Sequence, residues 1–187
     1  MDRLLSIFQN HLFTAFLPWI FFSALNGRSV VFASTGALIL MIILNLRELK
    51  KGFILPWGSV LLFAFFALNA YFSFWLWGDT HDFLLMNSAL AVIVLVSLIV
   101  GRPFTLQYAR EEVEQKYWFN PVFLKTNWIL TGIWAILMIV MALPSYFLTQ
   151  SQINSSWFWN YGLSIICIVI GMKANKTVPS WMKNQQK

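Results

Sequence analysis

The residues best suited to chemistry lie in one charged segment in the second half of the chain. Arg102, Tyr108, Arg110 and Glu111 bring two guanidinium groups, a phenol and a carboxylate close together. Guanidinium groups recognise phosphates and carboxylates, so this segment could hold an anionic lipid or quinone substrate. Catalysis would also need a nucleophile paired with a base, or a metal cluster, and neither accompanies these residues. We therefore expect no catalytic residue, and a lipid- or quinone-directed membrane enzyme is only an alternative.

Metal, cofactor and disulfide chemistry find little support in the remaining residues. The two histidines, His11 and His81, fall near opposite faces of the membrane arrangement inferred below and cannot share a metal. Asp79 and Asp82 beside His81 could chelate a cation weakly, but we favour a solvated outer loop as the explanation of these residues. The single cysteine, Cys167, excludes an internal disulfide. We expect no metal and no cofactor.

The composition indicates that lipid surrounds much of the chain. Hydrophobic residues make up 59% of the 187 residues and charged residues only 11%, whereas soluble proteins carry about 25% charged residues. A globular fold of this length could not bury so much apolar surface. The net charge of +6 comes from few, grouped basic residues. This pattern favours anionic lipid headgroups as a partner and does not favour nucleic acid.

Charge-free windows predict the membrane spans. A helical span needs about 20 apolar residues, and a charge at its centre costs about 3 kcal/mol. The expected fold is an all-α polytopic membrane helix bundle of five to six spans, forming a single transmembrane domain over 1–187. Pro18 and a short apolar core leave the first window open, either as a full span or as a re-entrant or interfacial segment. The candidate spans are 4–25, 29–46, 54–77, 83–101, 126–148 and 156–172.

The basic residues predict the orientation of these spans. The segments after the second, fourth and sixth windows hold 11 of the 13 basic residues, and the loops after the third and fifth windows hold none. Positively charged loops stay in the cytoplasm, so these segments and the C-terminus are expected there. Arg3 and Arg28 flank the first window and leave the side of the N-terminus open. Tryptophans near the expected span ends agree with this orientation.

One segment, 103–119, is expected to be an amphipathic helix on the cytoplasmic surface. Pro103 suits the first helical position, and Leu106, Ala109, Val113 and Tyr117 share one face. Two interpretations remain open: a connecting helix packed on its own bundle, or a surface that docks a partner. The residues of that candidate interaction surface are Arg102, Gln107, Tyr108, Arg110 and Glu111.

The candidate spans contain uncharged polar residues and no acidic ones. The absence of Asp and Glu counts against a proton-coupled carrier. Asparagines there are expected to form hydrogen bonds between helices, and some of them could instead line a polar path. Ser97 and Gly101, four residues apart, suit close helix contact. The candidate intramembrane contacts are Asn45, Asn69, Asn87, Asn127 and Asn160.

Several short motifs are similar to one known family. They are Phe16-Leu17-Pro18, Gly36-Ala37-Leu38-Ile39, Arg102-Pro103 with Gln107 beyond, the order Lys125, Asn127, Trp134, and Trp159-Asn160-Tyr161-Gly162. On these residues the chain distantly resembles the intracellular septation protein A family of bacterial inner-membrane proteins. The stretch 101–111 departs in detail from the family pattern. None of the motifs is catalytic.

The resemblance implies a role in cell-envelope maintenance, septation or division scaffolding at the bacterial inner membrane. Its partners would be the lipid bilayer and membrane proteins of division or cell-wall synthesis. We therefore expect a non-enzymatic multi-pass membrane protein. The alternative is a small channel or transporter for ions or small solutes. A chain this short would enclose a pore only as a homo-oligomer.

Overall fold

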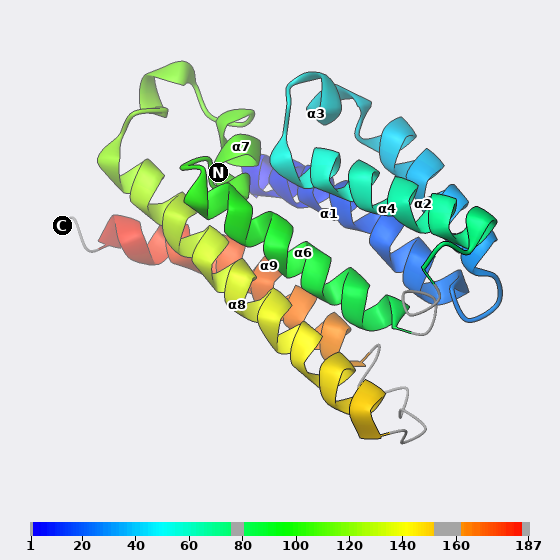
Figure 1. Ribbon diagram of the computed structural model, residues 1–187. Helices are drawn as coiled ribbons and strands as arrows, with labels where there is room; N and C mark the ends of the chain where they lie inside the picture. The colour runs from blue at the N-terminus through cyan, green and yellow to red at the C-terminus, as the bar shows by residue number, and fades with distance from the viewer. Residues whose placement is uncertain (1, 76–80, 152–161, 185–187) are drawn as a thin grey trace.

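The computed structural model describes the backbone of residues 2–75, 81–151 and 162–184, and within these the side chains of 14–75, 81, 84–143 and 162–183. Every element in these ranges is a helix, as the all-α expectation requires (Figure 1). In chain order the elements are α1 (Asp2–Leu25), α2 (Val30–Leu44), α3 (Leu46–Lys50), α4 (Ile54–Phe72), α6 (Asp82–Ile99), α7 (Phe104–Arg110), the 3-10 turn η1 (Gln115–Tyr117), α8 (Pro121–Ser151) and α9 (Leu163–Asn184).

Two of the described helices are long and apolar enough to cross a membrane. They cover Ile54–Phe72 in α4 and Pro121–Leu143 in α8. A third candidate is α6 taken together with α7, a pair bent by 71° at a short break. Thr14–Leu25 and Val30–Leu44 are apolar but shorter. These two to three helices fit a membrane protein, whereas the expected number of five to six spans is not confirmed by helix length.

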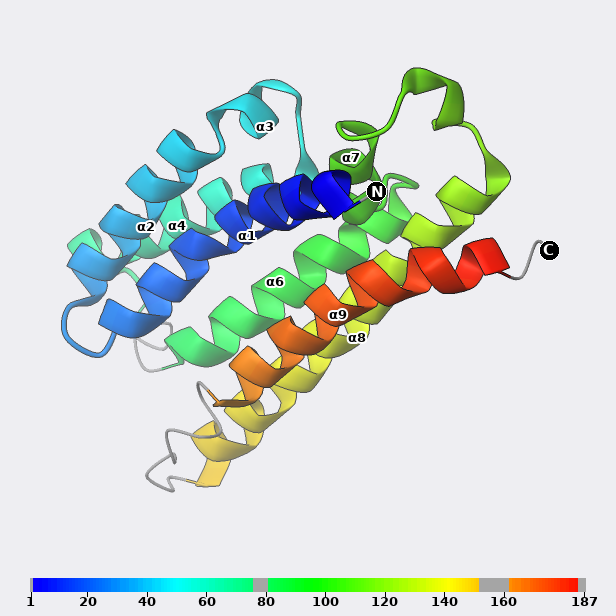
Figure 2. The ribbon, with the colours of Figure 1, turned by 180° about the vertical axis from the view of Figure 1, so that it is seen from behind.

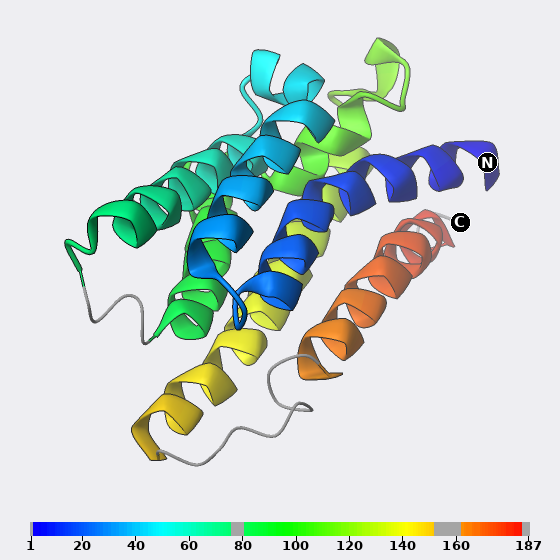
Figure 3. The same cartoon turned by 90° about the vertical axis from the view of Figure 1, so that its right-hand side faces the viewer.

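The helices pack as two groups that run alongside each other. In the first group α2 lies between α1 and α4, and in the second α8 packs on both α6 and α9 (Figures 1 and 2). Contacts between α4 and α6, and of α7 with both α1 and α8, join the two groups. The short helices α3 and α7 lie toward the same end of the bundle (Figure 3). That end therefore gathers the segments that connect α2 to α4 and α6 to α8.

Trp134 is the residue around which four helices meet. Its indole, on α8, is fully buried and stacks on Phe16 of α1 with ring centroids 5.4 Å apart. The ring of Phe104 from α7 approaches it edge-on at 6.3 Å. Its Nε1 donates a hydrogen bond to Asn175 Oδ1 of α9 at 3.2 Å, so the polar edge of the ring is satisfied inside the core. A Cβ at Gly171 would lie 2.6 Å from the indole, which explains why α9 has glycine there.

A second aromatic cluster fixes α1 against α4. Trp19 packs on Phe63 at 5.0 Å, and Phe22 stacks on Phe66 at 5.3 Å. The indole Nε1 of Trp19 donates to Ser59 Oγ at 3.1 Å, and both groups are buried. Buried aromatic pairs of this kind contribute about 1 kcal/mol each beyond the area they bury. The α1 helix runs unbroken from Asp2 to Leu25 despite its proline.

The outer surface of the bundle is apolar as well as its core. Large hydrophobic side chains are exposed on α2, α4, α6, α8 and α9. A soluble monomer rarely exposes contiguous apolar surface on this scale, because water disfavours it. Examples that lie at least half exposed are Ile43, Leu61, Val92, Ile136 and Val169.

Candidate functional site

Most of the charged residues predicted to form an interaction surface lie at one end of the bundle. We define the α3–α7 cap as residues 45–53, which include α3, together with 101–120, which include α7 and η1 (Figure 3). The two segments are far apart in the sequence, and side-chain hydrogen bonds and ion pairs join them. The hydrogen bonds, ion pairs and burial of the cap side chains determine which of them are free to contact a partner or substrate.

A tight turn places α7 in the cap. Gly101 has a φ of +72°, a conformation that glycine adopts at little cost. Ser97 Oγ then accepts a hydrogen bond from the backbone N–H of Phe104 at 3.2 Å, which satisfies a donor at the start of α7. The expected Ser97 and Gly101 pair thus lies at the 71° bend between α6 and α7, a role that the small-residue motif did not predict.

Buried hydroxyl groups then hold α7 against α8. Thr105 Oγ1 donates to the carbonyl of Asn127 at 2.8 Å, so the 2.7 Å contact between the two threonine hydroxyls leaves Thr131 as donor to Thr105. Thr105 and Thr131 are both fully buried. Buried polar groups are tolerated when each has a partner, and here each hydroxyl has one. The first turn of α7 is therefore part of the core.

This burial differs from the helix expected over 103–119. The helix ends at Arg110, and its buried residues are Phe104, Thr105, Leu106 and Tyr108, which do not form one narrow face. Trp118 explains the early end, because its Nε1 donates to the carbonyls of Arg110 at 3.1 Å and Val113 at 3.2 Å. The last carbonyls of a helix have no partner within it, and here a distant indole supplies one.

Two further features of the expected helix are replaced by other contacts. Tyr117 is 47% exposed and does not share a buried face with Leu106. Lys116 pairs with Glu114 at 2.6 Å, two residues before it, whereas helical spacing would favour Glu112 four residues before it. Both differences follow from the end of the helix at Arg110, because residues 111–120 no longer have helical spacing.

Gln107 connects the two segments of the cap. Its Oε1 accepts a hydrogen bond from the backbone N–H of Ile54 at 2.9 Å, at the start of α4. Its Nε2 donates to the carbonyl of Arg102 at 2.8 Å. One amide side chain thus satisfies the backbone donor of Ile54, directly after residues 45–53, and a backbone acceptor of its own segment. Gln107 is a structural bridge between the two segments.

Glu111 forms the ionic connection of the cap. Its Oε2 accepts from Arg47 Nη2 at 2.9 Å and also pairs with Lys51 Nζ. The side chain of Arg47 is 62% exposed and that of Lys51 38% exposed, so solvent screens both pairs. Their effect is therefore mainly on geometry, because they hold the two basic segments side by side.

Tyr108 is the most deeply buried of the predicted surface residues. Its ring meets Phe53 edge-on with centroids 5.0 Å apart, and its hydroxyl has no hydrogen-bond partner among the described residues. Burial, and then the nearby carboxylate of Glu48, raise the pKa of Tyr108 above its usual value. The phenol therefore stays protonated at neutral pH and cannot serve as a base or nucleophile there.

Arg110 and Arg102 complete the predicted set. The guanidinium of Arg110 lies over the ring of Trp118, 5.6 Å from its centroid, which is a cation–π geometry. Arg102 is exposed, and its carbonyl accepts the bond from Gln107. The cap therefore brings four of the five predicted residues into specific contacts of their side chains, while Arg102 joins through its backbone.

Sequence reasoning missed the residues that complete the cap from the other segment. Arg47 and Lys51 were assigned only to a basic loop, Trp118 was expected only as a tryptophan of the inner membrane interface, and Glu48 and Phe53 had no assigned role. Glu48 is buried, which is unusual for a carboxylate and signals a specific environment. The sequence offers one signal, the carboxylate of Glu48 within a run of basic residues. No local pattern links this run to Glu111, some 60 positions later in the chain.

The predicted intramembrane asparagines mostly bond within or close to their own helices. Asn45 Nδ2 donates to the carbonyl of Met41 at 3.3 Å, and Asn127 Nδ2 to that of Phe123 at 2.9 Å. Asn69 accepts from the backbone N–H of Trp75 at 2.8 Å and so closes the end of α4. Asn87 is buried on α6, and Asn160 lies outside the described residues.

The candidate metal residues are only partly described. His81 precedes α6, whereas Asp79 and the side chains of His11 and Asp82 lie outside the description. Within the described residues no group of three His, Cys, Asp or Glu side chains could hold a metal ion.

No model of a known protein family matches this chain, and no curated protein or solved structure is significantly similar to it.

Proposed function

We propose that this protein is a non-enzymatic multi-pass protein of a bacterial inner membrane, and that its α3–α7 cap docks a partner at the cytoplasmic face. Its role would be in cell-envelope maintenance or septation, which the family resemblance supports. The observation that carries the docking function is the pairing of Glu111 with both Arg47 and Lys51, because it joins two basic segments into one surface.

Six helices would cross the bilayer in this proposal: α1, α2, α4, α6, α8 and α9. The apolar exterior of the bundle supports lipid as their solvent. The α2 helix has 15 residues, about 22 Å at 1.5 Å per residue, which is shorter than the hydrocarbon core of about 30 Å. A bilayer accommodates a short helix by local thinning, at a cost of a fraction of a kcal/mol per Å.

The C-terminus and the cap would both face the cytoplasm. The cap holds six basic residues, and four more lie along 173–187 at the C-terminal end of the chain. Basic segments near span ends are retained in the cytoplasm, so the basic residues of the cap and those of 173–187 support the same orientation. The long α9 continues past the expected span end at 172 to Asn184, and its lysines would lie at the headgroups.

The exposed charge of the cap indicates the chemistry of its partner. Five of its basic residues are exposed, whereas of its four acidic residues only Glu111 and Glu114 are exposed. Complementary charge favours a membrane protein with an acidic cytoplasmic segment, such as a component of division or cell-wall synthesis. Phe119, 79% exposed beside these charges, offers an aromatic anchor of the kind found in binding hot spots. The exposed basic residues are Arg47, Lys50, Lys51, Arg102 and Lys116.

Labelling of single cysteines tests the orientation. Cys167 is the one native cysteine, so Cys167→Ala gives a background into which Lys50→Cys or Lys116→Cys is introduced. A membrane-impermeant maleimide should leave both positions unlabelled in intact cells and label them in inverted vesicles. Labelling from outside intact cells would overturn the orientation. A protein that stays in solution without detergent would overturn the membrane assignment.

Site-specific photocrosslinking in cells tests the docking function. A photoreactive residue at Phe119 should capture a membrane protein of division or cell-wall synthesis, and capture should fall several-fold when Arg47 and Lys51 are changed to Gln. The matched control is a photoreactive residue at Leu61, an exposed apolar position on α4 away from the cap. Equal products from both positions, or none from Phe119 across growth conditions, would contradict the proposal.

The hydrogen bonds of the predicted intramembrane asparagines do not favour a permeation path as the function. Asn45, Asn69 and Asn127 form hydrogen bonds to backbone groups of their own or the adjoining segment. These bonds engage the amides locally, within their own helices or at the helix end. A channel or carrier would require such groups to be available to a passing ion or solute.

A further inference from the structure

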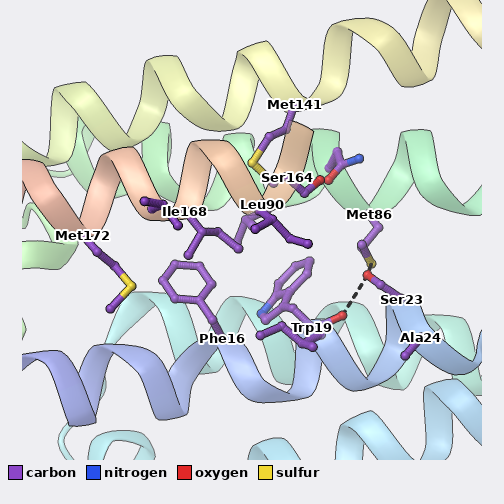
Figure 4. A pocket seen from close by; sticks show the side chains of 14 residues that line it. Phe16, Trp19, Ser23, Ala24, Met86, Leu90, Met141, Ser164, Ile168 and Met172 are labelled. Atoms are coloured by element: carbon purple, nitrogen blue, oxygen red, sulfur yellow. Dashed lines mark hydrogen bonds between the residues drawn. The ribbon is translucent and has the colours of Figure 1, made fainter. Parts of the chain in front are cut away.

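A pocket lies inside the bundle at a distance from the α3–α7 cap. It is formed where α1 faces α9, with α6 and α8 behind them, and its volume is about 370 Å³ (Figure 4). It occupies the half of α1 nearer Leu25, the N-terminal half of α6 and the first turns of α9, so it lies toward the opposite end from α3 and α7. The cap residues described above do not line it.

Most of the pocket is lined by hydrocarbon and thioether groups. No charged residue occurs among its described lining residues, and three methionines contribute flexible, polarisable side chains. The volume falls within the range of ligand sites, about 300–1,000 Å³. An apolar cavity disfavours water, because water finds no hydrogen-bond partners there. The pocket therefore fits an apolar occupant. The residues that give it this character include Phe16, Trp19, Leu90, Met86, Met141 and Met172.

The mouth of the pocket continues into the outer surface of the bundle. Ile20 on α1 and Ile165 and Val169 on α9 line the pocket, yet they are 44%, 55% and 58% exposed. The pocket is thus reached sideways, between α1 and α9, across apolar surface. If these helices cross a bilayer, as proposed above, the molecules at this mouth are lipid acyl chains.

Polar groups gather at one end of the pocket only. Ser23 and Ser164 lie toward one end of the pocket, while Phe16, Ile168 and Met172 form the other end (Figure 4). Asn87, which also lines the pocket, follows Met86 on α6, and Met86 lies beside Ser23. Ser23 Oγ donates to the carbonyl of Trp19 at 2.9 Å and lies 3.7 Å from Met86 Sδ. A phospholipid tail has the same division, with polar ester groups at one end and hydrocarbon beyond. The polar end of the pocket lies toward the outer face in the proposed orientation, as the ester groups of an outer-leaflet lipid would.

We propose that this pocket binds one acyl chain of a phospholipid, inserted between α1 and α9 from the outer leaflet with its ester end near Ser23, Asn87 and Ser164. The proposal rests on the membrane arrangement proposed above. Bound lipid would connect the two helix groups at the end opposite the cap, where α1 and α9 do not meet directly across the pocket.

A photoreactive phospholipid tests the proposal. The purified protein is reconstituted in phosphatidylethanolamine and phosphatidylglycerol vesicles that contain a phosphatidylglycerol with a diazirine in one acyl chain. After irradiation, mass spectrometry should locate a concentrated set of adducts on the facing residues of α1 and α9. Ile168→Trp fills the pocket and should reduce these adducts at least tenfold.

Matched variants separate occupancy of the pocket from contact with the outer surface. Ile166→Trp places the same indole on α9 at an exposed position that does not line the pocket, and it should keep the adducts. Ala24→Leu narrows the mouth from α1 and serves if Ile168→Trp does not fold. Added phospholipid should raise the melting temperature of the wild type and of Ile166→Trp in detergent more than that of Ile168→Trp.

The outcomes distinguish failure of this proposal from failure of the membrane arrangement. Adducts spread over α4 and α8 but no more frequent in the pocket would overturn the acyl-chain site and leave the membrane assignment intact. Equal pocket adducts in Ile166→Trp and Ile168→Trp would also overturn it, as would crosslinks showing that a second copy fills the mouth. A protein that acquires no lipid adducts anywhere would overturn both proposals.

Discussion

The indole Nε1 of Trp134 and Oδ1 of Asn175 form a hydrogen bond of 3.2 Å between α8 and α9, and both residues are buried. We predict that Asn175→Leu destabilises the protein by about 1–3 kcal/mol, because it leaves a buried indole N–H without a partner. The matched control is Lys176→Leu on the exposed side of the same helix, with little expected change. Thermal unfolding in detergent gives the comparison, and equal melting temperatures for the two variants would contradict the role assigned to this bond.

Close approach of α9 to the same indole gives a second prediction. A Cβ at Gly171 would lie 2.6 Å from Trp134, so Gly171→Ala should cost about 1–3 kcal/mol through overpacking. Gly132→Ala on α8 is the matched control, because nothing lies within 4 Å of its added Cβ. That control should be neutral or stabilising by up to about 1 kcal/mol, since alanine favours helix. Unfolding midpoints of the two variants check the prediction, which fails if Gly171→Ala is the more stable.

The sequence predicted the long apolar helices best, because each contains a long stretch without charged residues. Charge-free windows located α4, α6 and the long α8, because exclusion of charge from an apolar solvent depends on composition alone. The windows 4–25, 29–46 and 83–101 agree within two residues with α1 (Asp2–Leu25), α2 (Val30–Leu44) and α6 (Asp82–Ile99), whereas the window 54–77 is longer than α4 (Ile54–Phe72). In α4 the helix ends earlier because Ser73 turns into the left-handed conformation, with a φ of 50°, and Asn69 bonds to Trp75 beyond it.

The cap could be predicted only in part. Its charged residues were identified as a group, but their partners came from contacts between distant segments, such as Arg47 with Glu111 and Gln107 with Ile54. Helical spacing also gave the wrong end for α7, since the cap from Trp118 lies outside any local pattern. No sequence pattern predicted the pocket, because its lining residues come from four separate helices and are of the types that form an ordinary core.

The buried threonine pair gives a third prediction. Thr105→Val keeps the shape of the side chain but removes the hydroxyl that donates to Asn127 and accepts from Thr131. The free energy of unfolding should fall by about 1–3 kcal/mol, because the buried Thr131 hydroxyl loses its acceptor and the Asn127 carbonyl loses a donor. The double variant Thr105→Val with Thr131→Val should recover part of that loss, since it removes both hydroxyls of the pair. A double-mutant cycle on unfolding free energies measures the coupling, and strictly additive effects would refute it.

Disruption of the ion pairs of Glu111 should change local motion more than global stability. Glu111→Gln removes the charge that holds Arg47 and Lys51, and exposed pairs of this kind contribute at most about 1 kcal/mol. We expect faster amide hydrogen exchange in 45–53 and 111–120, with little change in melting temperature. Glu114→Gln, which removes the separate pair with Lys116, is the control and should leave 45–53 unchanged. Unaltered exchange in both segments of Glu111→Gln would show that these pairs do not connect them.

Glu112 should make the stability of the protein fall as the pH rises from mildly acidic to about 8. Burial raises the pKa of Glu112 from its ordinary value of 4.5 to about 8. The folded protein therefore holds this proton where the unfolded chain has lost it, and the contribution to stability falls as pH rises from about 4.5 to 8. Glu112→Gln should remove this part of the pH dependence and be relatively more stable than the wild type above pH 8. Unfolding followed in detergent across this range checks the sign, with the exposed Glu114→Gln as control. A wild type whose stability relative to Glu112→Gln rises with pH would contradict the assignment of a raised pKa to this carboxyl.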